Sequence, residues 1–283
     1  MTSTSRRGPP PPPPASRNDF QIAIICALPE ERDTVEALMT RYYKSEKPDY
    51  GQASADENYY TLGELGGKPI VLVTPRNMDT INRSHLASNM RHRFPNLAWA
   101  LVVGIAGGAP FDRSMQPSEI HLGDVLISTQ IIGYDFGAVY DDKFESKTAI
   151  EDVLPRAPAR VTNFFNIFKT RRGNAFKRLL AKTQQELGDL PQFDGEEYQR
   201  PASDTDRVYE SHYRHKHQDP TVCETCSKCQ ERHHPVCNEV IKASCKDLGC
   251  QPQFTRKARD PMIHFGRVAS GNGVMSSGSG SHD

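Results

Sequence analysis

The sequence has no excess of charge of either sign and no long hydrophobic run. Its 283 residues include 35 Lys and Arg and 35 Asp and Glu, so its formal net charge is zero. A dedicated nucleic-acid-binding domain usually carries an excess of positive charge, which this sequence lacks. Nucleic acid is therefore not an expected partner. No apolar run is long enough to cross a membrane, and Arg6 and Arg7 are not followed by the apolar segment of a signal peptide. We expect no membrane partner and a cytoplasmic location.

Hydrophobic residues are also scarce, at 36% of the chain, so part of the sequence is not expected to enter a core. Residues 1–18 contain the run Pro9–Pro14 and are predicted to form a disordered Pro-rich tail. Such a tail is a candidate ligand for a peptide-recognition domain, although a merely solvated tail is the favoured interpretation. Residues 276–283 are rich in Ser and Gly and predict a flexible tail. The folded domain is expected between residues 19 and 275.

Within that domain, short apolar segments alternate with amphipathic ones. Buried strands are expected over residues 22–28, 70–74, 98–103, 124–132 and 262–269. Helices are expected from Pro29 through Tyr42, and around residues 86–94, 161–168 and 176–180, where apolar residues recur at helical spacing. This alternation predicts a layered α/β fold.

One of these strands runs into a glycine-rich turn. Leu101–Val103 is continuously apolar, which predicts a strand buried on both faces of a sheet. Glycine permits positive φ and close approach of the backbone to a ligand, and ligands of α/β sheets bind beyond the carboxyl ends of the strands. The turn therefore predicts a small-molecule site made by Gly104, Ile105, Ala106, Gly107 and Gly108. The spacing is not that of a dinucleotide-binding G-x-G-x-x-G loop.

Three parts of the sequence together resemble the nucleoside phosphorylase and nucleosidase family, the purine/uridine phosphorylase superfamily. They are residues 22–31, residues 101–110 with 119–128, and residues 263–275. The resemblance implies a three-layer α/β fold with a central mixed sheet over about residues 19 to 275. It also implies cleavage of the N-glycosidic bond of a nucleoside by water or phosphate, with no cofactor required. A homo-oligomer is compatible with it.

The resemblance assigns roles to particular residues. Glu31, in the first strand-to-helix turn, would orient the attacking water, whereas the alternative is that it only complements the helix dipole. Gly273, Val274 and Met275 match the segment that lies along the purine, although the last two also suit an ordinary core. Phosphorylases of the family carry arginine and serine where this chain has Val102 and Ile105. Neither apolar side chain binds an anion, so a purine nucleosidase is favoured over a phosphorylase.

The end of the chain departs from the family pattern. After the segment that contains Met275, relatives continue to a glutamate that binds the ribose hydroxyls and an aspartate that protonates the purine, whereas this sequence ends at Asp283. We therefore expect that the C-terminal part of the fold is missing and that catalysis by this chain alone is impaired. A catalytically inactive nucleoside-binding or sensor module is the alternative function.

A Cys- and His-rich polar region covers residues 183–260 and is interpreted as an insertion. Six of the seven cysteines lie between Cys223 and Cys250, a clustering that favours metal over disulfides in a reducing compartment. The ligand types and spacing allow a structural zinc at Cys223, Cys226, Cys229 and Cys237. Only the Cys223–Cys226 pair is regular, so unliganded loop thiols are the favoured interpretation, and a zinc-dependent interaction domain is a further alternative. His212, His215 and His217 are interpreted as a solvated, weakly basic patch.

Overall fold

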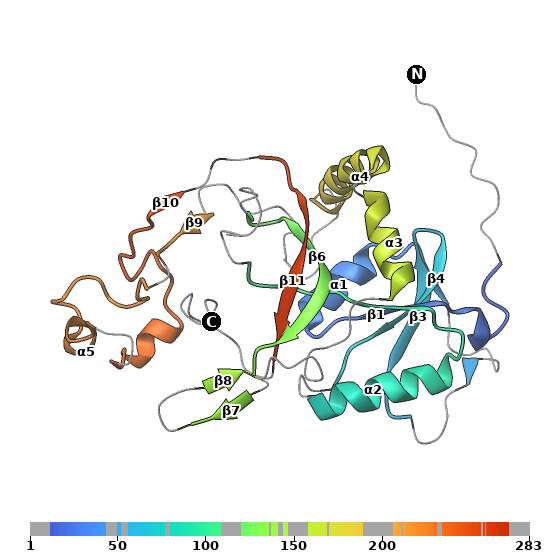
Figure 1. Cartoon of the computed structure of the whole chain (residues 1–283), viewed down its shortest axis with the longest axis horizontal. Helices are drawn as coiled ribbons and strands as arrows, with labels where there is room; N and C mark the ends of the chain where they lie inside the picture. Colours follow the sequence, from blue (N-terminus) through green and yellow to red (C-terminus); the bar gives the residue numbers. More distant parts are fainter. Residues whose placement is uncertain are drawn as a thin grey trace. The chain divides into compact units, whose positions relative to one another are not determined.

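The computed structural model forms two compact units, residues 1–106 and residues 107–283, and each is described by itself. The structure describes residues 12–43, 50–51, 56–76, 80–108, 120–135, 137–140, 144–146, 158–168, 170–188, 206–210, 212–230, 234–255, 257 and 259–271. Figure 1 labels most of the helices and strands within these ranges.

The N-terminal unit is built on one mixed sheet. Its elements are β1 (Ile22–Ile25), α1 (Pro29–Ala37), β2 (Arg41–Tyr43), β3 (Tyr60–Leu65), β4 (Lys68–Val73), α2 (Thr80–Arg93) and β5 (Trp99–Val102). The five strands lie in the order β2-β3-β4-β1-β5. β1 is parallel to β4 and β5, whereas β2, β3 and β4 pair antiparallel. The predicted α/β class with a mixed sheet is confirmed.

The two helices cover opposite faces of this sheet. Along β4, Val71 and Val73 pack in the cluster that contains Leu86 and Met90 of α2. The alternating residues Ile70 and Leu72 pack in the cluster that contains Val35 of α1. Because successive side chains of a strand point to opposite faces, both faces of β4 are buried and the unit has three layers.

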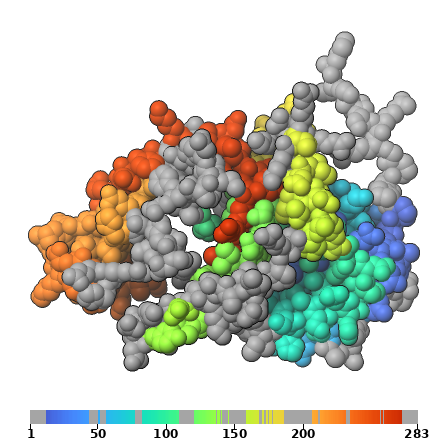
Figure 2. Space-filling model, viewed as in Figure 1, coloured from blue at the N-terminus to red at the C-terminus, as the bar shows by residue number. Residues whose placement is uncertain are grey.

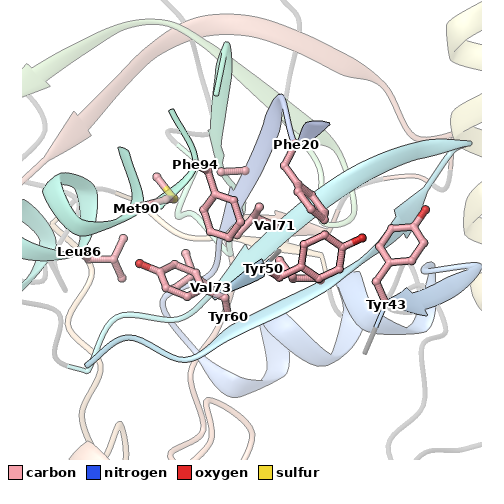
Figure 3. Close-up of a cluster of buried hydrophobic side chains, with 11 residues drawn as sticks. Phe20, Tyr43, Tyr50, Tyr60, Val71, Val73, Leu86, Met90 and Phe94 are labelled. Atoms are coloured by element: carbon pink, nitrogen blue, oxygen red, sulfur yellow. The ribbon is translucent and has the colours of Figure 1, made fainter. Parts of the chain in front are cut away.

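Aromatic rings fill the layer between the sheet and α2 (Figure 3). Phe20 makes edge-on contacts with Tyr50 and Phe94, at ring-centroid distances of 5.5 and 5.6 Å. Such a geometry stabilises aromatic pairs beyond the area they bury. The hydroxyl of Tyr50 donates to the carbonyl of Pro14, and Pro14 is itself buried. The packed part of this unit therefore reaches upstream of residue 19, the boundary expected from composition.

Two local expectations for the N-terminal unit are wrong. The helix predicted through Tyr42 ends at Ala37, and Tyr42 pairs with Gly63 in the β2–β3 hairpin. The strand at residues 98–103 is not buried on both faces, because Leu101 is 44% and Val102 79% exposed and successive side chains point to opposite faces. β5 also lies at the edge of the sheet. An edge strand has a hydrogen-bonded neighbour on one side only, and among the described residues β5 pairs with β1.

The second unit contains a long parallel strand pair and two helices. Its elements are β6 (Val125–Gly133), β7 (Gly137–Val139), β8 (Phe144–Ser146), α3 (Ala159–Phe168), α4 (Arg171–Gly188), β9 (Arg207–Val208), α5 (Glu224–Ser227), η4 (Asn238–Ile241), β10 (Phe254–Thr255) and β11 (Ile263–Ser270). β6 and β11 pair over their whole length, from Val125 opposite Ile263 to Gly133 opposite Ser270. α4 extends to Gly188, past the residue where the insertion is expected to begin.

Candidate functional site

Glu31 lies in the first turn of α1, just beyond the carboxyl end of β1. Pro29 is the first helical residue, and Glu31 follows in the first turn. Its Oε2 accepts hydrogen bonds from the backbone N–H groups of Ala27 and Leu28, at 2.8 and 3.0 Å. The bond from Leu28 is the capping contact that a purely structural glutamate would make. The helix-start role of Glu31 is therefore present in the structure.

The other oxygen of Glu31 makes a contact that helix capping does not explain. Oε1 accepts a hydrogen bond of 2.8 Å from the backbone N–H of Ile105, in the turn that follows β5. β1 and β5 are adjacent parallel strands, so their carboxyl ends meet at one edge of the sheet. Two segments that are far apart in the sequence are thus joined through one carboxylate, which is only 8% exposed.

Gly104 makes room for this carboxylate. A Cβ atom at position 104 would lie 2.5 Å from Oε1 of Glu31 and 2.8 Å from its Cδ. Of the described glycines, those with positive φ are Gly66, Gly67, Gly123 and Gly249. Gly104 therefore does not use the positive φ that glycine permits; what the position requires is space for the Glu31 side chain.

The remaining predicted site residues are only partly brought together. The side chain of Ile105 is 80% exposed, and Ala106, Gly107 and Gly108 are exposed as well. A Cβ at Gly107 would meet nothing within 4 Å, whereas one at Gly108 would lie 3.0 Å from the side chain of Ile120. The predicted purine-facing residues Gly273, Val274 and Met275 lie outside the described residues.

A buried thiol lies beside the carboxylate. Cys26 directly precedes Ala27, whose N–H donates to Glu31, and is fully buried. Burial, reinforced by the negative charge of Glu31, raises the pKa of the Cys26 thiol to about 11. The thiol is therefore neutral at physiological pH and is not an activated nucleophile.

In the second unit, Asp124 holds the start of β6 to the start of β11. Its side chain is 1% exposed, and it accepts hydrogen bonds from the Arg259 guanidinium, from the His264 ring at 2.8 Å and from the backbone N–H groups of His121 and Met262. Burial raises the pKa of Asp124, but the Arg259 hydrogen bonds and the other donors outweigh it and lower the pKa to about 2. These hydrogen bonds join the segment before β6 to the segment that leads into β11, which gives Asp124 a structural role.

The Cys/His region brings some of its predicted metal ligands together and separates one. The Sγ atoms of Cys223, Cys226 and Cys237 lie within 4.8 Å of one another. The thiol of Cys229 instead faces the carbonyl oxygen of His234 at 3.7 Å. The histidines that join the clusters were not predicted as ligands. They are His215 and His217.

The prediction of a solvated histidine patch holds for two of its three members. His212 is exposed and pairs with Glu210 at 2.9 Å, and His215 is exposed although its Nδ1 faces two thiols. The prediction is wrong for His217, whose side chain is only 14% exposed. The spacing of His215 and His217, two residues apart and just before Cys223, was the available signal in the sequence.

A shallow pocket of about 420 Å³ also lies in the second unit, away from the Glu31 turn in the sequence. It is lined by Arg207, Lys246, Gly249, Cys250, Gln251, Pro252 and Thr255. None of these residues was predicted to bind a nucleoside.

In the described parts of the chain, no helix combines the length and the hydrophobicity needed to span a membrane.

Comparison with known proteins gives a family match over most of the chain. The family model of the Phosphorylase superfamily matches residues 21–279. A nucleotide-binding leucine-rich repeat (NLR)-like protein of Hyaloscypha variabilis is 24% identical over 274 residues, which cover 92% of this chain and 23% of that protein. The chain thus spans less than a quarter of that relative's length.

Solved structures with partial similarity include two from Helicobacter pylori. A 5'-methylthioadenosine/S-adenosyl homocysteine nucleosidase in complex with an inhibitor is 16% identical, with a TM-score of 0.37, over 59% of this chain and 60% of that one. A futalosine hydrolase is 15% identical, with a TM-score of 0.38, over 60% of this chain and 61% of that one.

Proposed function

Because the chain belongs to the Phosphorylase superfamily, we propose that it cleaves the N-glycosidic bond of a purine nucleoside, with water rather than phosphate as the nucleophile. The observation that carries the proposal is the hydrogen bond from the Ile105 N–H to Oε1 of Glu31. It holds a carboxylate at the carboxyl ends of two parallel strands, which is where α/β sheets bind their ligands.

The carboxylate has the capacity for this chemistry. An ionised carboxylate accepts about four hydrogen bonds, and the described donors to Glu31 are three backbone N–H groups. Oε1, which accepts one of them, retains a lone pair for a water molecule. In the proposed reaction the water oxygen bonds to the anomeric carbon and its proton passes to Oε1. The glycosidic C–N bond breaks, and its electron pair goes to the purine nitrogen.

The charge of Glu31 supports water over phosphate. Glycosidic cleavage passes through an oxocarbenium-like sugar, whose positive charge a nearby carboxylate stabilises. A phosphate dianion would instead be repelled by that carboxylate. The N–H of Ile105 already donates to Glu31, and the exposed side chains of Val102 and Ile105 carry no charge that would offset the repulsion.

Release of free base from adenosine-type nucleosides by the full chain, with and without phosphate, tests the proposal. We expect release that does not depend on phosphate. Glu31→Gln should lower turnover per folded protein by about 10²- to 10⁴-fold, the usual contribution of a general base. Its stability should fall by only about 1 kcal/mol, because the Gln amide nitrogen cannot accept the Ile105 N–H.

Glu30→Gln is the matched control, since Glu30 is adjacent in the chain and exposed, and it should keep full turnover. Phosphate-dependent release, or equal turnover of the two variants, would overturn the role given to Glu31. Nucleoside binding without any turnover would instead assign the chain as an inactive binding module.

A further inference from the structure

The segment from residue 206 to residue 255 has almost no conventional core. Among its described residues, the buried apolar side chains are Val208, Val240 and Leu248, and they are accompanied by buried cysteines. The regular structure of the same described residues amounts to one pair of two-residue strands, β9 and β10, and two four-residue helices, α5 and η4. A segment of this size normally needs disulfides or a metal to remain folded. Its described residues nevertheless form a small cluster of buried side chains that includes Cys226 and Leu248; the segment is orange to red-orange in Figure 2.

Disulfides do not hold this segment, because all of its cysteines are free. The Sγ atoms of Cys226 and Cys237 lie 3.7 Å apart, well beyond the S–S bond length of about 2.05 Å. Two thiolates bound to one tetrahedral zinc, each at about 2.3 Å from the metal, lie about 3.8 Å apart. The observed separation therefore matches a shared zinc ion, and Cys223 is the third thiol within 4.8 Å.

His217 is the candidate fourth ligand of this first site, and of the three thiols it is grouped with Cys237. Its ring nitrogen lies within 4.8 Å of the Sγ of Cys237. Nε2 of His217 is buried and has no hydrogen-bond partner among the described residues, an arrangement that costs free energy unless something binds there. Glu239, the nearby carboxylate, lies 3.7 Å from that nitrogen and is 84% exposed, so it does not satisfy it.

A second cluster has the geometry of a metal site as well. Nδ1 of His215 lies 3.5 Å from the Sγ of Cys245 and 3.8 Å from the Sγ of Cys250. A nitrogen and a sulfur on the same tetrahedral zinc are separated by about 3.6 Å. The other ring nitrogen of His215 lies 3.1 Å from the carbonyl oxygen of Ala243. Donation to that carbonyl would leave Nδ1 free to bind metal, as second-shell carbonyls do in known sites.

Lys216 lies between the two histidines and closes the loop that holds the first site. Its Nζ donates to the carbonyl oxygens of Cys226 and Cys229, at 3.0 and 2.6 Å. The side chains of residues 215, 216 and 217 thus point to three different parts of the segment. One short stretch of chain would therefore connect both clusters.

We propose that residues 206–255 form a zinc module with two sites. Cys223, Cys226, Cys237 and His217 bind one ion, and His215, Cys245 and Cys250 bind the second, with a water molecule in the fourth position. The proposed module does not rest on the proposed nucleoside chemistry, whose Glu31 and Ile105 lie in the N-terminal unit. The site with four protein ligands holds its metal more tightly than the site with three.

Elemental analysis of the full chain tests this assignment. We expect about two zinc ions per chain, about one in either Cys226→Ser or Cys250→Ser, and none in the double variant. Cys229→Ser is the matched control, since Cys229 is a buried cysteine of the same segment that lies outside both clusters. It should keep both ions. Gradual addition of a chelator should release the ion of the three-ligand site first.

Cobalt exchange uses the wild-type chain, so its result does not depend on whether any variant folds. We expect thiolate-to-cobalt charge-transfer absorption from both sites, and protease cleavage between residues 206 and 255 after complete chelation, because metal binding and folding are coupled. A chain that purifies with less than about half an equivalent of zinc and shows no thiolate–cobalt absorption would overturn the proposal. Loss of zinc in Cys229→Ser equal to that in Cys226→Ser would overturn His217 as the fourth ligand.

Discussion

Replacing Asp124 by Asn should destabilise the pairing of β6 with β11. The carboxylate is almost completely buried and accepts hydrogen bonds from Arg259 and His264, together with backbone N–H groups of His121 and Met262. An Asn side chain has a single acceptor oxygen, and its NH₂ group would face donors. Removing one partner of a buried ion pair typically costs about 3 to 5 kcal/mol, and we expect a loss of about that size.

The pKa of Asp124 gives an independent magnitude. Folding lowers it from 3.8 to about 2, and a shift of that size corresponds to about 2 kcal/mol. A lowered pKa in the folded state contributes stability above the unfolded pKa, and that stability is lost as the pH falls through the folded pKa. The wild-type chain should therefore lose about 2 kcal/mol more than Asp124→Asn between about pH 4 and pH 2.

Hydrogen exchange of peptides that cover β6 and β11, measured across a urea series at several pH values, would report this locally. Asp260→Asn is the control, because Asp260 lies in the segment that leads into β11 and is exposed. It should change stability by less than about 0.5 kcal/mol. If Asp124→Asn behaves like this control at neutral pH, or retains the acid-dependent loss, the structural role of Asp124 is refuted.

Two further predictions concern the N-terminal unit. Gly104→Ala places a Cβ 2.5 Å from Glu31, so the carboxylate must move. Base release should therefore fall about as far as in Glu31→Gln. Thermal melting should show a destabilisation of about 1 to 3 kcal/mol. Gly107→Ala, which meets nothing within 4 Å, should leave the melting temperature nearly unchanged, and equal melting of the two alanine variants would contradict the packing argument. Because the pKa of Cys26 is about 11, iodoacetamide at about pH 8 should leave its thiol unmodified in the native chain and alkylate it after unfolding. Mass spectrometry of the Cys26 peptide measures this modification. Rapid labelling of the native chain would show that the thiol is not buried.

The strands of the N-terminal unit that have both faces covered were predictable from the sequence. β1 and β4 coincide with apolar segments, because a strand buried on both sides needs apolar residues at every position. β6 and β11 also coincide with predicted strand segments, although their residues are mostly half-buried or exposed. The hairpin of β2 and β3 was not predictable in this way. Tyr42 follows Val35 at a helical interval, yet the partner that makes it a strand residue, Gly63, lies beyond a polar stretch.

The candidate site was likewise predictable from the sequence only where its features are local. The position of Glu31 at the end of β1 follows from local sequence, since Pro29 and the acidic residues mark a helix start. Its contact with Ile105 depends on β1 and β5 being neighbours in the sheet, which no local pattern records. Likewise, the sequence around His217 does not show that its ring lies near Cys237, which is twenty residues downstream.

The pairing of β6 with β11 has a consequence for folding during synthesis. In the N-terminal unit the widest strand pairing joins residues 22 and 99, so its sheet is complete once β5 has emerged from the ribosome. β6 must instead wait for residues 263–270, and at common translation rates that delay is on the order of 10 s. During that time an apolar strand is exposed without its partner, and β6 is therefore an expected binding segment for a ribosome-associated chaperone.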